Sequence, residues 1–183
     1  VVANNKGIRV THDKANIKAF TYPADELTSW SDQRRPEGLT DDKGIYSYDG
    51  YNIYHSTYAN SSSIFDVNGN YIGWNGTVQS TSGYNGHWMQ WEFISKVKIS
   101  SIRVMGSSYS GNNDHKQSVP TNAKLFGSND ASTWVQIGND LNETQQSAFF
   151  DGDTPKWKEF TINANKEYKY IRCAVSKVYG EYS

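Results

Sequence analysis

The chain has 183 residues and a formal net charge of −1, with 18 basic and 19 acidic residues. Because phosphate binding needs a basic face, this balance argues against nucleic acid as the main partner. No apolar run is long enough to span a membrane as a helix, so we expect no membrane insertion. Aromatic residues make up 14% of the chain, which argues against disorder and favours half-buried strands.

Residues 1–47 differ from the rest and are interpreted as an N-terminal extension that packs on the main domain. Residues 8–11 and 17–20 alternate apolar and polar side chains, so each predicts a short strand. A helix start at residues 23–27 and a polar loop follow.

Residues 48–183 contain short apolar–polar segments separated by polar loops. Many short strands with turn signals between them predict an all-β fold, an antiparallel β-sandwich or jelly roll. We expect strands at residues 51–58, 89–93, 97–105, 157–162 and 168–175, with polar loops at 75–87, 106–119 and 138–156.

Two of these segments predict most of the core. Residues 89–93 alternate cleanly, which turns Met89, Trp91 and Phe93 inward. From 97 to 105 the alternation gains one extra residue across Ser100 and Ser101, which we interpret as a β-bulge in one continuous strand.

Residues 123–137 predict a β-hairpin. Apolar residues flank a cluster of turn formers from Gly127 to Ser132, and Asn, Asp and Gly suit tight turns. We interpret that cluster as turn chemistry and Trp134 as a core residue. The single cysteine, Cys173, shares a strand face with apolar neighbours and is expected to be buried as a small hydrophobic side chain.

Five stretches, taken in order, resemble the discoidin-like family, also called coagulation factor V/VIII C-type domains, which overlaps with galactose-binding carbohydrate-binding modules. They are SIFDVN at 63–68 followed by Trp74, HWMQWEF at 87–93, VKISSIRV at 97–104, LFGSNDASTW at 125–134 and YIR at 170–172. The resemblance implies a galactose-binding-domain-like β-sandwich over residues 48–183. The last strand of the family has no counterpart before residue 183. Either it lies in sequence not present here or the N-terminal extension pairs in its place, and we favour the extension.

The resemblance also implies a structural calcium ion in the loop that follows Phe65. Asp66, Asn68 and Asn70 offer side-chain oxygens at alternate positions, and calcium takes six to eight oxygen ligands. The alternative is an Asx-rich turn that its own hydrogen bonds close.

The family's sugar sites lie in loops at one end of the sandwich, which indicates two loops here. An aromatic ring can stack on the apolar face of a sugar while amide, carboxylate and imidazole groups bond its hydroxyls. The expected ligand-binding residues are Tyr84, Asn85, His87, Tyr109, Asn112, Asn113, Asp114, His115 and Tyr179. The alternative is that both loops are solvated polar segments.

The sequence carries no nucleophile elbow, zinc-protease motif, phosphate-binding loop or cysteine pair. Together with this, the resemblance implies a non-catalytic, lectin-like carbohydrate-binding module, outside the cell or on a cell or virion surface. A phage tail or fibre protein, or a bacterial surface protein, fits as the larger assembly that carries it. The alternative is a structural or assembly module that uses the same fold to dock proteins without binding sugar.

Overall fold

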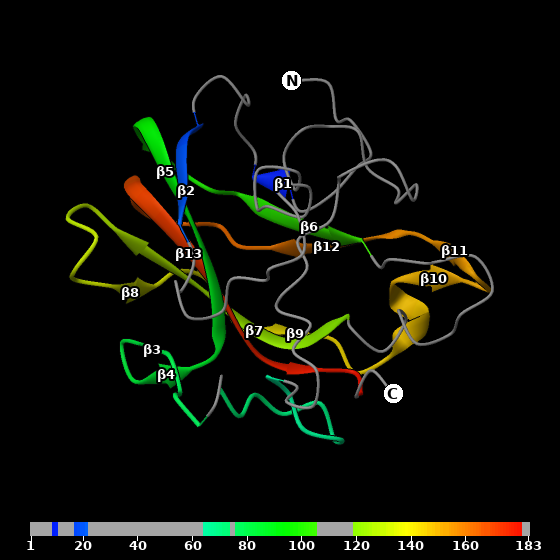
Figure 1. Ribbon diagram of the computed structural model, residues 1–183. Helices are drawn as coiled ribbons and strands as arrows, with labels where there is room; N and C mark the ends of the chain where they lie inside the picture. Colours follow the sequence, from blue (N-terminus) through cyan, green and yellow to red (C-terminus); the bar gives the residue numbers. More distant parts are fainter. Residues whose placement is uncertain (1–8, 11–16, 22–63, 74–75, 106–118, 181–183) are drawn as a thin grey trace.

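The computed structural model describes residues 9–10, 17–21, 64–73, 76–105 and 119–180. Within these residues, two antiparallel sheets form the two layers of a β-sandwich (Figure 1). The predicted all-β sandwich is therefore confirmed. The larger sheet has the order β2 (Ile17–Thr21), β5 (His87–Val97), β13 (Tyr168–Val178), β7 (Pro120–Ser128) and β8 (Val135–Gln136), and β9 (Leu141–Asn142) also pairs with β7.

The smaller sheet and the remaining short elements complete the described chain. The smaller sheet has the order β1 (Arg9–Val10), β6 (Ser101–Met105) and β12 (Trp157–Thr161). Separate hairpins are β3 (Ser80–Thr81) with β4 (Tyr84–Asn85) and β10 (Phe150–Asp151) with β11 (Thr154–Pro155), and the 3-10 helix η5 spans Gln146–Ala148. The segment 138–156, expected to be a loop, thus contains β9, η5, β10 and β11. In the part of the chain described here, no helix is long and apolar enough to cross a bilayer.

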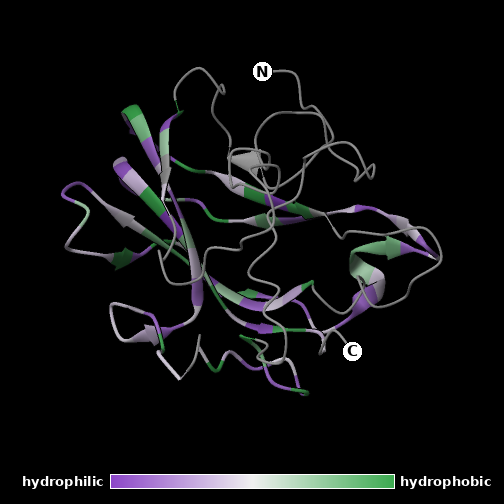
Figure 2. Cartoon of the chain, in the orientation of Figure 1, coloured by the Kyte–Doolittle hydropathy of each residue, from purple (hydrophilic) through white to green (hydrophobic). Residues whose placement is uncertain are grey.

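The core lies between the two sheets, and strand alternation determines which side chains enter it. Met89, Trp91 and Phe93 of β5 are at most 5% exposed, so their predicted inward orientation is confirmed. They share one cluster with Ile102 of the smaller sheet and Ile171 of β13. Figure 2 shows the matching alternation of apolar and polar residues along β5 and β13.

The predicted continuous strand from 97 to 105 is wrong. β5 ends at Val97 in the larger sheet, and β6 starts at Ser101 in the smaller one. Val97, Ile99 and Ile102 are all buried, as expected, but the extra residue is part of a crossing between sheets. β5 pairs with β13 in the larger sheet, whereas β6 pairs with β12 in the smaller sheet. The chain therefore passes from one layer to the other between Val97 and Ser101.

The hairpin predicted at 123–137 is confirmed. β7 and β8 pair through Phe126 with Gln136 and Gly127 with Val135. The Asp130 carboxylate closes the turn, accepting the Thr133 amide at 2.7 Å and the Ser132 amide at 2.9 Å. These bonds, with the Ser128 hydroxyl, hold the pKa of Asp130 well below its usual range. The cluster is turn chemistry, as the sequence predicts.

The N-terminal extension contributes one strand to each sheet. β2 pairs with β5 at one edge of the larger sheet, and β1 pairs with β6. Cys173 is 3% exposed, which confirms its predicted burial. The boundary at residue 47, the helix start at 23–27 and the strand at 51–58 lie outside the described residues, so they stay predictions.

Candidate functional site

Two short strands, β3 and β4, form a hairpin at one end of the sandwich, beside the segment 64–73 (Figure 1). Its turn places Ser82 at φ 52° and Gly83 at φ 81°. Positive φ at both central residues gives the strand twist that two-residue hairpins prefer. The sequence predicts a loop over this stretch, and the Ser-Gly dipeptide was the available turn signal.

Hydrogen bonds close the base of this hairpin and join it to the segment 64–73. The Gly86 amide donates to the Gln79 carbonyl at 3.1 Å, and the Gln79 amide donates to the Tyr71 hydroxyl at 3.1 Å. A Cβ atom on Gly86 would lie 2.9 Å from the Val175 carbonyl oxygen. Residue 86 must therefore be small, because the hairpin lies directly on β13.

Tyr84 fixes the other end of the hairpin to the larger sheet. Its hydroxyl donates to Asn122 Oδ1 at 2.8 Å and lies 2.5 Å from the Ser176 hydroxyl. Its ring lies near Phe126, at 6.1 Å between centroids, and beneath the Lys124 ammonium group at 4.9 Å. Burial is the main cause that raises the pKa of Tyr84. The ring is half-buried, so Tyr84 serves first as an anchor.

The other predicted ligand-binding residues differ in how far they are exposed to solvent. Asn85 is exposed, and Tyr179 is 47% exposed after the end of β13. His87 is 3% exposed and has the inward parity of Met89 on β5, so a surface ligand does not reach its ring. Of the ligand-binding residues predicted in the loop that ends at residue 87, Tyr84 and Asn85 therefore remain candidates and His87 does not. Tyr109, Asn112, Asn113, Asp114 and His115 lie outside the described residues.

The predicted calcium loop is closed by its own hydrogen bonds. Asp66 Oδ1 accepts the Asn70 and Asn68 amides at 2.8 and 2.9 Å. The Asn70 side-chain nitrogen lies 3.1 Å from Oδ2 and 3.2 Å from Oδ1. The Asn70 side chain first, then the backbone amides, lower the pKa of Asp66. As placed, these residues do not fit calcium, because N–H groups face the oxygens that a cation needs.

A second cluster, which the sequence analysis missed, lies on the outer face of the larger sheet. We call it the outer cluster, and its members are Tyr84, Trp88, Phe126, Trp134, Tyr170, Arg172 and Ala174. Arg172 lies between two indoles, with its central carbon 3.8 Å from the Trp88 ring and 4.1 Å from the Trp134 ring. Its Nη1 donates to Thr81 Oγ1 of β3 at 3.0 Å. The outer cluster is thus joined to the β3–β4 hairpin.

The signal for this cluster was present in the sequence. Trp88 and Gln90 have the opposite parity to Met89, and Arg172 has the opposite parity to Cys173. A tryptophan on the strand face that is expected to be solvated needs a partner, because large apolar surfaces seldom stay exposed alone. What the sequence did not show was which cation and which second ring would cover it.

Comparison with known proteins gives distant structural likenesses only. No family model and no curated protein matches the chain. Among solved structures, the CBM32-1 and CBM32-2 domains of Clostridium perfringens ZmpB match with a TM-score of 0.48 and 13% identity, over 94% of this chain and 34% of that one. The family 32 carbohydrate-binding module of Streptococcus pneumoniae EndoD matches with a TM-score of 0.43 and 9% identity, over 97% and 88%.

A third match is CpGH89CBM32-5 of Clostridium perfringens, in complex with GalNAc-β-1,3-galactose. Its TM-score is 0.36 at 16% identity, over 51% of this chain and 56% of that one. The chain therefore spans about half of that protein and 34% of the ZmpB structure. At these scores the likeness is distant, and the function proposed below rests on the side chains of this chain.

Proposed function

We propose that this chain is a non-catalytic carbohydrate-binding module that recognises glycans through loops at one end of its sandwich. The binding surface comprises the β3–β4 hairpin and, from the sequence, the loop 106–116. Its place is outside the cell, on a cell surface or on a virion surface.

The observation that carries the proposal is the fixed hairpin with the exposed Asn85 beside the half-buried ring of Tyr84. Contacts from Tyr71, Asn122 and Arg172 hold the hairpin before any ligand arrives. A sugar has an apolar C–H face and a hydroxyl rim, so it suits a surface that offers both rings and amide groups. Preformed contacts of this kind lower the ordering cost of binding.

A surface with few contacts gives weak affinity for one site. We expect dissociation constants for the monomer in the range of about 1 μM to 1 mM. Useful binding strength then comes from repeated copies on a larger assembly, because linked sites bind with a high effective concentration. A phage tail or fibre protein, or a bacterial surface protein, would supply such repetition.

A glycan array tests the proposal with the module displayed multivalently. We expect binding above background, and we expect Asn85→Ala and Tyr109→Ala to weaken it about 10-fold or more, as loss of a hydrogen bond or a stacked ring does. Asn139→Ala is the matched control, since Asn139 is an exposed asparagine between β8 and β9. If no glycan binds above background in the multivalent format, the carbohydrate-binding proposal fails.

Exposed apolar side chains in the segments 64–73 and 76–79, which precede the hairpin in the chain, favour a second candidate, a protein-docking module. Val67 is 68% exposed, Ile72 46% and Val78 44%, and exposed apolar surface is typical of protein interfaces. An empty glycan array would favour this alternative. If a glycan binds and Asn85→Ala abolishes this binding, the hairpin is a sugar site and the protein-docking alternative is excluded for it.

Chelation separates the two interpretations of the Asp66 loop. Because N–H groups within the loop satisfy the carboxylate, we expect EDTA to leave the melting temperature unchanged. Calcium that bound the folded chain would instead raise the melting temperature with its concentration. A rise of several degrees that Asp66→Asn removes would support the calcium prediction and contradict the closed turn.

A further inference from the structure

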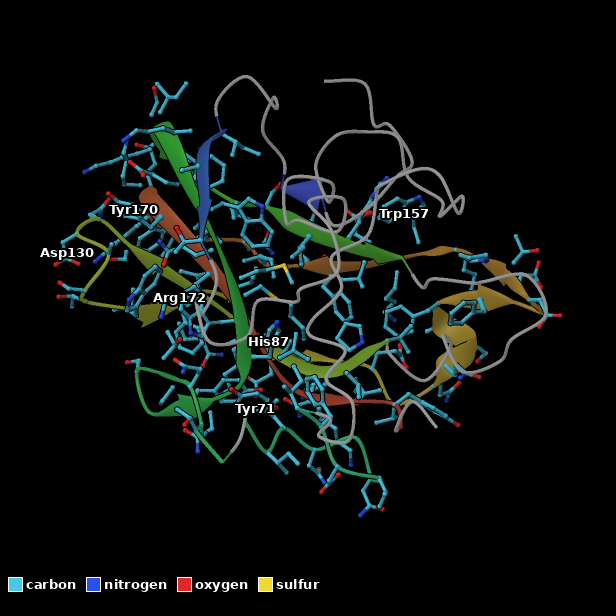
Figure 3. All side chains as sticks on the ribbon, viewed as in Figure 1. Tyr71, His87, Asp130, Trp157, Tyr170 and Arg172 are labelled. Carbon is cyan, nitrogen blue, oxygen red and sulfur yellow. The ribbon has the colours of Figure 1, made fainter. Side chains whose placement is uncertain are left out.

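Arg172 is the one residue of the outer cluster that carries a full charge in a largely apolar setting (Figure 3). It projects from β13 on the face opposite to the core, in register with Gln90 of β5 and Phe126 of β7. The side chain is partly buried, and this burial lowers its pKa to about 10. It therefore stays charged at neutral pH while water covers it only in part.

The two indole rings hold the plane of the guanidinium group. Trp88 and Trp134 lie within 4.1 Å of its central carbon, and such stacking favours a cation over the ring face. Two rings this close to the central carbon leave little room for a partner above or below the group. Any further partner of Arg172 must approach in the plane of the group, at its edge.

Hydrogen bonds within the chain use part of that edge. Gln90 Oε1 accepts from Nε at 3.3 Å and from Nη2 at 2.7 Å, and Thr81 Oγ1 accepts from Nη1 at 3.0 Å. Each terminal nitrogen of a guanidinium carries two N–H groups. Among the described residues, these bonds engage one N–H on Nη1 and one on Nη2, so each terminal nitrogen keeps a second N–H that an oxyanion can accept.

Within the described residues, the charge of Arg172 has no acidic partner. Among the described residues, two cations of this sheet have acidic partners: Lys18 pairs with Glu92 at 2.8 Å and Lys124 with Asp140 at 3.3 Å. Arg172 forms no ion pair in the described part of the chain, and both of its acceptors, Gln90 and Thr81, are neutral.

We infer that the outer cluster binds the oxyanion of an acidic sugar, with the free edge of Arg172 as its anchor. The oxyanion is a carboxylate, as in a uronic or sialic acid, or a sulfate ester. This inference rests on the proposed function and gives the charge class of its ligand. The hairpin supplies contacts to the neutral hydroxyls, and Arg172, bonded to Thr81 at the base of that hairpin, selects glycans that carry a negative charge.

The test compares three sets of oligosaccharides of equal length, one with uronate, one with sulfate and one neutral, on the full chain. We expect one of the two charged sets to bind at least about 10-fold more tightly than the neutral set, because a charge-assisted pair of hydrogen bonds is worth this much. Arg172→Gln should remove the preference of the chain for the charged set over the neutral set. The matched control is Arg103→Gln, since Arg103 is already paired with Glu159 at 2.9 Å in the smaller sheet.

A measurement on the unaltered chain covers the case in which Arg172→Gln does not fold. NMR of the arginine Nε–H groups should show the Arg172 signal shifting with the acidic sugar and staying constant with the neutral one. Absence of both the shift and the charge preference overturns the inference, while binding of neutral sugars would leave the proposed function standing. If no sugar of any set binds, the proposed function itself has failed.

Discussion

Phe93→Ala is expected to destabilise the fold by about 3–5 kcal/mol. The side chain of Phe93 is 0% exposed and lies in the main core cluster with Trp91 and Ile171. Removal of the ring takes away its burial and leaves a cavity that close-packed neighbours fill only in part. Urea unfolding followed by tryptophan fluorescence measures the loss as a lower midpoint.

The adjacent residue gives the control for this change. Ile94 follows Phe93 on the same strand and is 57% exposed, so Ile94→Ala should alter the free energy of unfolding by less than about 0.5 kcal/mol. Equal losses at the two positions would contradict the placement of β5, because alternate side chains of a strand point to opposite faces.

Gly69→Ala is expected to have the second largest effect. Gly69 lies at φ +76°, and a Cβ atom there would be 2.2 Å from the Val178 carbonyl oxygen. The glycine carbonyl also accepts the Val178 amide at 2.8 Å, which ties the Asp66 loop to the end of β13. Alanine must therefore push the loop away from β13 and weaken this bond. We expect a loss of about 2–5 kcal/mol, the sum of left-handed strain and steric overlap.

Gly76→Ala separates these two contributions. Gly76 has nearly the same φ, +78°, but nothing lies within 4 Å of its added Cβ. It should cost only the left-handed strain of about 1–2 kcal/mol. The difference between the two variants in thermal or urea unfolding then measures the close approach to Val178. A difference near zero would show that the loop does not lie against β13.

Local patterns predicted the strands that face the core and the hairpin at 123–137. His87 shows what strand alternation can predict and where the prediction stopped short. It has the same parity as Met89 and Trp91, so alternation extended by one step would have predicted its burial. The resemblance instead places His87 in a ligand-binding loop, because the polar stretch 75–87 gives no sign that β5 already starts at His87.

The crossing at residues 98–100 could not be predicted in the same way. A bulge and a change of sheet leave the same mark in the sequence, one extra residue in an alternating run. Whether the chain bulges or changes sheet depends on the pairing of β6 with β12. β12 lies more than fifty residues further along the chain. Pairing between distant strands is decided by the packing of the whole sandwich, not by the run itself.

By itself, the sequence determined an all-β domain, its inward residues and its turn at Asp130, because strand alternation and turn chemistry depend on neighbouring residues only. Tertiary structure alone decided the setting of Arg172. Its stacking rings come from β5 and from the turn before β8, and its acceptors come from β3 and β5. These groups are far apart along the chain, and only the folded sheet brings a cation, two indoles and a free pair of N–H groups to one place.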